Sequence, residues 1–301
     1  MSSRIYLVTG AAGFLGSNVC AQLLEKGEKV RALVLPNDKS VKYIPKEVEI
    51  CLGDLCDENS LETFFTIPQG MHSVIIHCAS MVTVDPSYSE KLMEVNVTGT
   101  RNIITKCLAH PECLKMVYVS STGAIPEQPM GTKIKEVSKF EPNDPKKVVG
   151  AYSQSKAKAS QMVMDSVKVM GLKACIVHPS GILGPNDHAA VDKGLIGEAY
   201  ILANEPVTLK EMCEMLHEEC DCQKIKFYLP LDLADKIAQT LEKRAEKKGE
   251  KPMMTTFSVY NLARNNEFDY SKAKEELGYT TRSYKETIHD EVEWLKEEGL
   301  I

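Results

Sequence analysis

The sequence lacks the features of a membrane-spanning or nucleic-acid-binding protein. No window approaches the roughly 20 consecutive apolar residues that a membrane-spanning helix needs. Lys and Arg number 36 against 42 Asp and Glu, and the resulting net charge of −6 gives no general attraction for nucleic acid or anionic membranes. We therefore expect a small-molecule partner, with neither nucleic acid nor an integral membrane segment involved.

We also expect no secretory leader. Residues 1–4 lead directly into a strand-like run at 5–9, without a charged stretch followed by an apolar one. The ten cysteines lie mostly inside apolar runs, as Cys51, Cys78 and Cys107 do, which is typical of reduced core thiols. A cytoplasmic location is the expectation.

Short apolar runs alternate with amphipathic stretches from residue 4 to about residue 178. The expected strands are 4–9, 29–35, 48–52, 73–78, 115–120 and 172–178, and the expected helices are 13–26, 58–66, 88–109 and 150–170. This alternation predicts an α/β fold of the Rossmann type, a doubly wound parallel sheet with helices on both faces. The proline-containing stretch 123–148 is expected to be a long functional loop.

The pattern changes after Pro179, where glycines and a proline interrupt the chain. A strand is expected at 195–202, and helices are expected at 207–221, 231–248, 271–277 and 283–298. We expect a dinucleotide-binding domain over residues 1–180. Residues 181–301 are expected to form a small, shortened substrate lobe with C-terminal helices, some of which could return to the sheet.

The clearest motif is Thr-Gly-Ala-Ala-Gly-Phe-Leu-Gly at residues 9–16, between the first expected strand and helix. Gly10 permits a tight turn, Gly13 lets backbone N–H groups approach a pyrophosphate, and Gly16 allows close packing of helix and strand. Such a triplet can also be a flexible turn. The strand before it and the helix after it favour a dinucleotide site.

The choice between NAD and NADP stays open. The acid that would bind the ribose is absent from the end of the second strand, where Leu35 lies. Asp38 could reach the ribose if the loop curls back, whereas Lys39 or Arg31 could meet a 2′-phosphate. Asp54 is expected to accept a hydrogen bond from the adenine amino group, with a turn or N-cap aspartate as the alternative.

A second motif carries the chemistry. Tyr152 and Lys156 lie four residues apart, as neighbours on one helical face, and a nearby cation lowers the pKa of a phenol from its ordinary value of roughly 10. Such a pair also arises by chance on surface helices. Here, however, an apolar strand ends in Ser120, Ser121 and Thr122, at the edge where α/β sheets bind ligands. We expect Ser121 to donate to a substrate carbonyl, although these hydroxyls could simply cap a loop.

These motifs, with residues 53–54, 76–80 and 96–100, resemble the extended short-chain dehydrogenase/reductase family over most of the chain. Residues 178–185 and 268–279 are similar to dihydroflavonol reductases and 3β-hydroxysteroid dehydrogenases. The resemblance implies that Ser121 polarises the carbonyl and that Tyr152 gives or takes its proton. It also implies that Lys156 lowers the tyrosine pKa while holding the nicotinamide ribose, and that Asn96 supports the site.

The cofactor-binding residues predicted in this way form one set. They are Gly10, Ala12, Gly13, Phe14, Leu15, Gly16, Asp54, Leu55, Ala79, Ser80, Tyr152, Lys156, Pro179 and Ile182. Two departures from the resembled branch stand out. Leu35 occupies the position at which dihydroflavonol reductases often have an arginine for the 2′-phosphate. A strand and a helix of the substrate lobe are either naturally absent or missing from the sequence after His188.

We expect an NAD(P)-dependent oxidoreductase that interconverts a ketone and a secondary alcohol on a lipophilic or polycyclic, steroid- or flavonoid-like substrate. A nucleotide-sugar epimerase on the same fold and a non-catalytic NAD(P)-binding sensor are the alternatives. Dehydratase chemistry is disfavoured because Gly123 and Ala124 stand where dehydratases usually carry Asp-Glu. The resemblance also implies a possible homodimer formed through two helices.

A zinc site is a further alternative in the second half of the chain. Cys213, His217, Cys220 and Cys222 are suitable ligand types. Their helical spacing is more typical of a half-buried helix face, and the proposed chemistry needs no metal. We therefore expect none.

Overall fold

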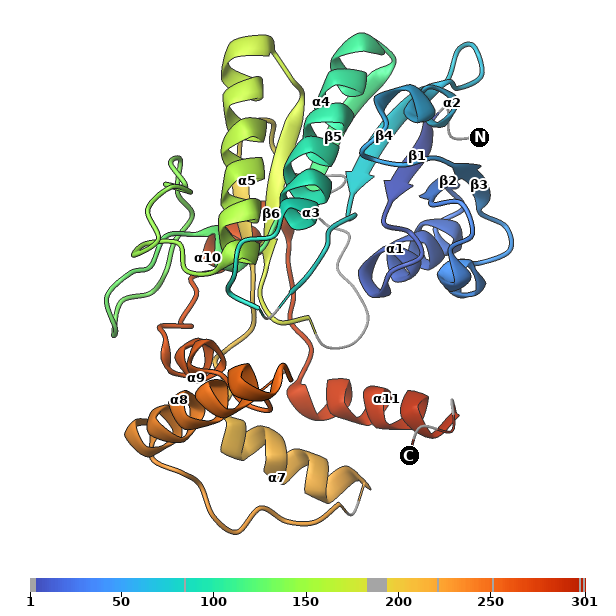
Figure 1. Ribbon diagram of the computed structural model, residues 1–301. Helices are drawn as coiled ribbons and strands as arrows, with labels where there is room; N and C mark the ends of the chain where they lie inside the picture. The colour runs from blue at the N-terminus through green and yellow to red at the C-terminus, as the bar shows by residue number, and fades with distance from the viewer. Residues whose placement is uncertain are drawn as a thin grey trace.

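The computed structural model describes residues 4–83, 85–182, 194–220, 222–250, 252–297, 299 and 301. A seven-stranded parallel sheet lies at its centre, in the order β3-β2-β1-β4-β5-β6-β7 (Figure 1). The strands are β1 (Arg4–Thr9), β2 (Lys29–Val34), β3 (Glu49–Leu52), β4 (His72–His77), β5 (Cys113–Val119), β6 (Ala174–Pro179) and β7 (Ala199–Leu202). The order reverses between β1 and β4, as in a doubly wound fold. The predicted Rossmann-like class is confirmed.

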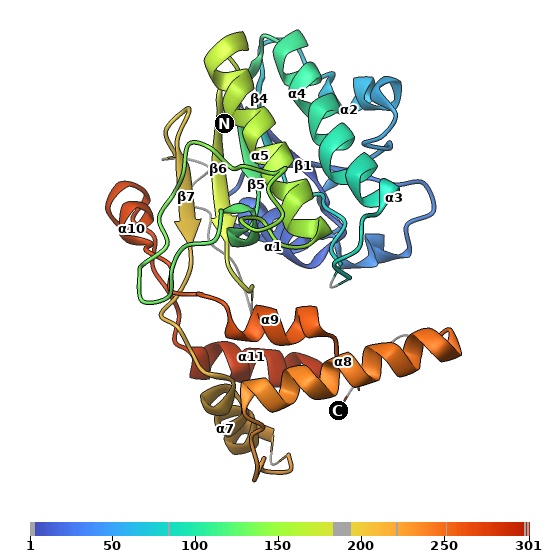
Figure 2. The same ribbon diagram turned by 60° about the vertical axis from the view of Figure 1, so that its left-hand side comes forward.

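Helices cover both faces of the sheet, which explains why the strands are apolar on both sides. On one face lie α2 (Glu62–Phe65), α4 (Gly99–Ala109) and α5 (Ala151–Met170), packed on side chains such as Leu7 and Ile75. On the other lie α1 (Phe14–Glu25) and α10 (Ser271–Leu277), packed on side chains such as Val8 and Val177 (Figure 2).

A group of helices lies beyond the carboxyl ends of the strands. It consists of α7 (Leu209–Cys220), α8 (Leu231–Lys248), α9 (Thr256–Ala263) and α11 (Tyr284–Glu297). Figure 1 shows these four helices below the sheet, with α8 against α9 and α7 against α11. Strand β7 and helix α10, although they follow residue 181, belong to the sheet and its covering layer. Within the described residues, every helix is too short or too polar to cross a lipid bilayer.

The predicted helix 88–109 is interrupted. The structure has α3 (Glu90–Met93), a π-helical turn at Glu94–Thr98 and then α4. In this turn the buried Asn96 bonds through its amide to the Met81 backbone and to Ser155. A pattern of apolar residues cannot predict a turn that serves a polar contact.

Other differences from the predicted elements are smaller. The strand predicted at 195–202 begins only at Ala199, because residues 195–198 form a turn. In this turn Gly197 has φ +83° and the Glu198 N–H donates to the Leu195 carbonyl. The helix predicted at 58–66 starts as a 3₁₀ turn, Glu58–Leu61, before α2. Helix α9 was not predicted. The shortening of the substrate lobe that is expected after His188 falls on residues outside those that the structure describes.

Candidate active site

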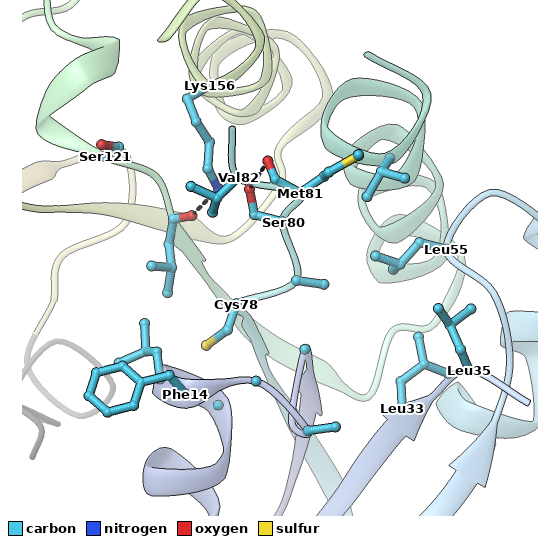
Figure 3. Close-up of a pocket in the computed structure, with 18 of the residues that line it drawn as sticks. Phe14, Leu33, Leu35, Leu55, Cys78, Ser80, Met81, Val82, Ser121 and Lys156 are labelled. Atoms are coloured by element: carbon cyan, nitrogen blue, oxygen red, sulfur yellow. Dashed lines mark hydrogen bonds between the residues drawn. The ribbon is translucent and has the colours of Figure 1, made fainter. Parts of the chain in front are cut away.

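A cavity of about 620 Å³ opens along the carboxyl ends of β1, β2, β4 and β5, a size suited to a cofactor or small ligand (Figure 3). Every residue of the predicted catalytic and cofactor-binding sets lines this cavity. These residues are Gly10, Ala12, Gly13, Phe14, Leu15, Gly16, Asp54, Leu55, Ala79, Ser80, Ser121, Tyr152, Lys156, Pro179 and Ile182. Segments far apart in sequence therefore meet at the switch point of the sheet, where open α/β folds bind ligands.

The glycine turn forms the floor of the cavity. Gly10 has φ +68°, and a Cβ placed on it would lie 2.6 Å from the Ala79 nitrogen. A Cβ on Gly16 would overlap the Gly10 carbonyl oxygen, so helix α1 can pack here only without a side chain. Gly13 is the N-cap of α1 and offers no side chain to the first-turn N–H groups. These donors and the positive end of the helix fit a pyrophosphate.

The far end of the cavity suits an adenosine. Leu35 and Asp38 line it, as does Asp54, whose Oδ1 accepts from the Cys56 nitrogen at 2.8 Å. Asp54 is thus both a turn aspartate and a cavity residue. The expectation that Arg31 could meet a 2′-phosphate is wrong: its guanidinium donates to three backbone carbonyls at 63–66 and pairs with Glu49 at 3.0 Å.

The catalytic end holds Tyr152, Ser121 and Ser80. Burial raises the pKa of the Tyr152 phenol, and the hydroxyls of Ser121 and Ser80, which lie beside it, oppose that rise. The phenol is therefore protonated at neutral pH. Ser121 Oγ also accepts from the Gly123 nitrogen at 3.1 Å, which orients the hydroxyl.

Lys156 is almost completely buried, at 2% exposure. Its Nζ donates to the Val119 carbonyl at 2.8 Å, the dashed line beside Lys156 in Figure 3, and lies 5.1 Å from the centre of the Tyr118 ring. Burial lowers the pKa of Lys156 to about 7. That Lys156 lowers the pKa of Tyr152 stays a prediction. The neighbours that oppose the rise in this pKa are the hydroxyls of Ser121 and Ser80.

Two further buried side chains, Asn96 and His77, support the site. Asn96 accepts from the Met81 nitrogen at 2.7 Å and donates to Ser155 Oγ at 2.9 Å, so it ties the cavity wall to α5. His77, not singled out from the sequence, contacts Thr9 Oγ1 at 2.6 Å and a second threonine hydroxyl at 3.0 Å. Burial lowers its pKa to about 3, so the ring is neutral.

His178 was also missed as a functional residue. It lies at the end of β6, and its Nδ1 donates to the Ser121 carbonyl at 3.0 Å. Burial lowers the pKa of His178 to about 4, so the imidazole is neutral and this N–H is a fixed donor. Its partner is 57 residues earlier in the chain, and only its place beside Pro179 could have drawn attention to it.

Two of the four zinc ligands considered from the sequence, His217 and Cys220, make hydrogen bonds to backbone carbonyls. His217 Nδ1 donates to the Cys222 carbonyl at 2.6 Å, and the Cys220 thiol donates to the Leu216 carbonyl. Across the described part of the chain, no group of three or more His, Cys, Asp or Glu side chains could hold a metal ion.

Comparison with known proteins agrees with this geometry. A family model described as "NAD dependent epimerase/dehydratase family" matches residues 6–261. The "Sterol demethylase protein B" of Methylococcus capsulatus is 27% identical over 98% of this chain and 99% of its own. The "Putative dihydroflavonol 4-reductase" of Synechocystis is 28% identical, with 98% of this chain and 96% of the relative covered. The crystal structure of gox2253 has a TM-score of 0.79 and 27% identity, with 98% of each chain covered.

Both alignments are longer than this chain, at 339 and 344 positions against 301 residues. The alignment with the sterol demethylase protein spans 339 positions, and a chain of 301 residues therefore leaves at least 38 of them empty. The chain belongs to the NAD dependent epimerase/dehydratase family, among the extended short-chain dehydrogenases/reductases, and is an NAD(P)-dependent dehydrogenase or reductase acting on CH–OH and carbonyl groups.

Proposed function

We propose that this enzyme interconverts a ketone and a secondary alcohol on a lipophilic or polycyclic substrate. The observation that carries the proposal is the pairing of a protonated phenol, Tyr152, with the Ser121 hydroxyl at one end of the cavity. The wall beside them is apolar and open, since Met81, Val82 and Ile182 line the cavity and are 41%, 69% and 39% exposed. An apolar substrate could cover these side chains.

Ser121, Tyr152 and Lys156 have different roles in the reduction. A nicotinamide cofactor supplies the hydride when it is bound. Ser121 donates a hydrogen bond to the carbonyl oxygen as negative charge develops there. Tyr152 gives the same oxygen its proton, and in the direction of alcohol oxidation it takes the proton back. Lys156, held by the Val119 carbonyl, would hold the nicotinamide ribose and place positive charge near the phenolate.

The names of the relatives support a polycyclic substrate. One is named a sterol demethylase protein and the other a dihydroflavonol reductase, and both align over nearly their whole length. Epimerase activity is the second candidate, because the matching family is described by epimerases and dehydratases together. A cytoplasmic location and a homodimer formed through two helices belong to the same proposal.

A substrate screen tests the function. Ketosteroids, flavonoid ketones and UDP-sugars are incubated with NADH or NADPH at neutral pH, where Tyr152 is protonated, and the absorbance of the reduced cofactor is followed. We expect cofactor oxidation with a polycyclic ketone. Interconversion of UDP-sugars without net cofactor oxidation would favour the epimerase. Tight cofactor binding without turnover of any compound would favour the sensor.

Asp38 is proposed to favour NAD(H) over NADP(H). Its carboxylate lines the adenosine end of the cavity, where a 2′-phosphate would meet like charge. We expect Asp38→Ser to raise the ratio of kcat/KM for NADPH to that for NADH by about tenfold, which corresponds to about 1.4 kcal/mol. Asp57→Ser, which removes an exposed carboxylate that does not line the cavity, is the control. An unchanged ratio in Asp38→Ser would show that Asp38 does not select the cofactor.

A further inference from the structure

Helix α9 connects the lobe, the group of helices α7, α8, α9 and α11, to the catalytic end of the cavity. In both views it lies between α8 and the lower end of α5 (Figures 1 and 2). It begins at a capping box formed by Thr255 and Ser258, so its first turn is well fixed. It packs on α8. It also contacts two segments that precede it by more than 100 residues, and each of these segments adjoins a catalytic residue.

The first contact is with the start of α5. Gly150 is the N-cap of α5, has φ +89°, and makes no side-chain capping hydrogen bond. The Phe257 ring of α9 lies directly on it: a Cβ at Gly150 would be 2.6 Å from Phe257 Cζ. Tyr152 is the second residue of this helix, and the N–H of the first, Ala151, donates to the Pro86 carbonyl at 3.1 Å. Because the first turn has no side-chain cap, the ring packing helps to hold Tyr152 in place.

The second contact is with the loop that follows Ser121. Tyr260 Oη donates to Glu127 Oε1 at 2.6 Å, and the Arg264 guanidinium lies 3.1 Å from the same oxygen. The Arg264 side chain is only 9% exposed, so this ion pair is shielded from water. Glu127 in turn donates its N–H to the Lys147 carbonyl at 2.7 Å, which closes the loop between Ser121 and α5.

Asn265, just beyond α9, strengthens the same attachment. It is buried, and its amide donates to the carbonyls of Pro129 at 2.9 Å and Thr132 at 2.8 Å. The Phe257 and Tyr260 rings stack at 6.1 Å, so the two contacts share one rigid face of α9. A single short helix of the lobe thus braces both the segment after Ser121 and the segment before Tyr152.

We propose that α9 is a positioning element for the proton transfer and that Phe257 is its main positioning residue. Phe257 holds the first turn of α5 in place, and so holds the Tyr152 oxygen beside the Ser121 hydroxyl. This inference rests on the proposed role of Tyr152 as proton donor. It makes the lobe part of the reaction geometry as well as a wall for the substrate.

The test compares Phe257→Ala with Phe257→Leu, which keeps an apolar side chain on Gly150. We expect Phe257→Ala to lower kcat for the ketone about tenfold or more, since misplacing a reacting group by about 1 Å can cost a hundredfold. The Kd for NADH should change less than about twofold, and Phe257→Leu should recover most of kcat. Leu262→Ala is the matched control, because Leu262 lies on the same helix and is 64% exposed. Its kcat and its Kd for NADH should equal those of the parent.

A readout independent of turnover separates this proposal from the proposed function. The ionisation of Tyr152 is followed by NMR of protein labelled at the tyrosine Cζ, with the signal assigned by its loss in Tyr152→Phe. Phe257→Ala should let water reach the phenol and move its raised pKa toward the ordinary value of about 10, with or without a known substrate. If Phe257→Ala fails to fold, Tyr260→Phe removes only the bond to Glu127 and is measured instead. An unchanged kcat and an unchanged Tyr152 ionisation would overturn the proposal.

Discussion

Tyr152→Phe is expected to lower turnover of the ketone by about 10²- to 10⁴-fold, the usual contribution of a positioned acid or base. The substitution removes one oxygen and keeps the ring, so packing in the cavity is preserved. It removes the proton donor that burial holds in its protonated form at neutral pH. The measurement is kcat at saturating ketone, together with the Kd for NADH from its fluorescence, which should change little.

Tyr88→Phe is a suitable control for this result. Tyr88 is 72% exposed and does not line the cavity, so its loss of a hydroxyl should leave kcat unchanged. If Tyr152→Phe turned over the ketone as fast as the parent enzyme, the assignment of Tyr152 as acid would be wrong. If both kcat and NADH binding were lost together, Tyr152 would serve the cofactor rather than the proton.

The second large effect is expected from Gly16→Ala. A single added carbon would overlap the Gly10 carbonyl oxygen, and this neighbour is backbone that cannot rotate away. The helix and the turn must move apart, at a cost of about 3 kcal/mol of unfolding free energy. The turn that faces the pyrophosphate moves with them. We therefore expect a lower Tm and at least tenfold weaker NADH binding.

Gly27→Ala tests whether this effect is specific. Gly27 lies just beyond the other end of α1, has φ +75° and would place its Cβ in open space. It should lose about 1 kcal/mol from backbone strain and keep its affinity for NADH. Equal NADH affinity in Gly16→Ala and Gly27→Ala would contradict the role assigned to Gly16.

Local patterns were sufficient to predict the sheet and the cofactor cavity. Strand and helix periodicity are properties of neighbouring residues, and the spacing of Gly10, Gly13 and Gly16 records the close approach of helix to turn. Because all parallel strands end at one edge, Ser121 and Ala79 could be placed beside that turn without coordinates.

Contacts between distant segments could not be predicted in the same way. From its place on the second strand, Arg31 is predicted to be able to meet the 2′-phosphate. The strand register instead places it beside Glu49, and its guanidinium donates to carbonyls at the C-terminal end of α2. His178 holds Ser121 across 57 residues, and Tyr260 reaches Glu127 across 133. Such pairs leave no periodic signal in one sequence.

The relation between Lys156 and Tyr152 shows the same limit within a single helix. The spacing of four residues correctly predicts that both side chains face the cavity. It does not predict that the Lys156 ammonium donates a hydrogen bond to the Val119 carbonyl. Nor does it predict that the hydroxyls of both Ser80 and Ser121 lie beside the Tyr152 phenol. Helical geometry fixes the direction of a side chain, but the partners come from other strands.

The structure of a ternary complex with NADH and an unreactive ketone analogue tests the central claim most directly. The account predicts that Tyr152 Oη and Ser121 Oγ both lie within about 3.2 Å of the ketone oxygen, with the pyrophosphate over the turn from Gly10 to Gly16. A complex in which the ketone oxygen is bound by other groups, with the Tyr152 oxygen turned away from it, would contradict the account.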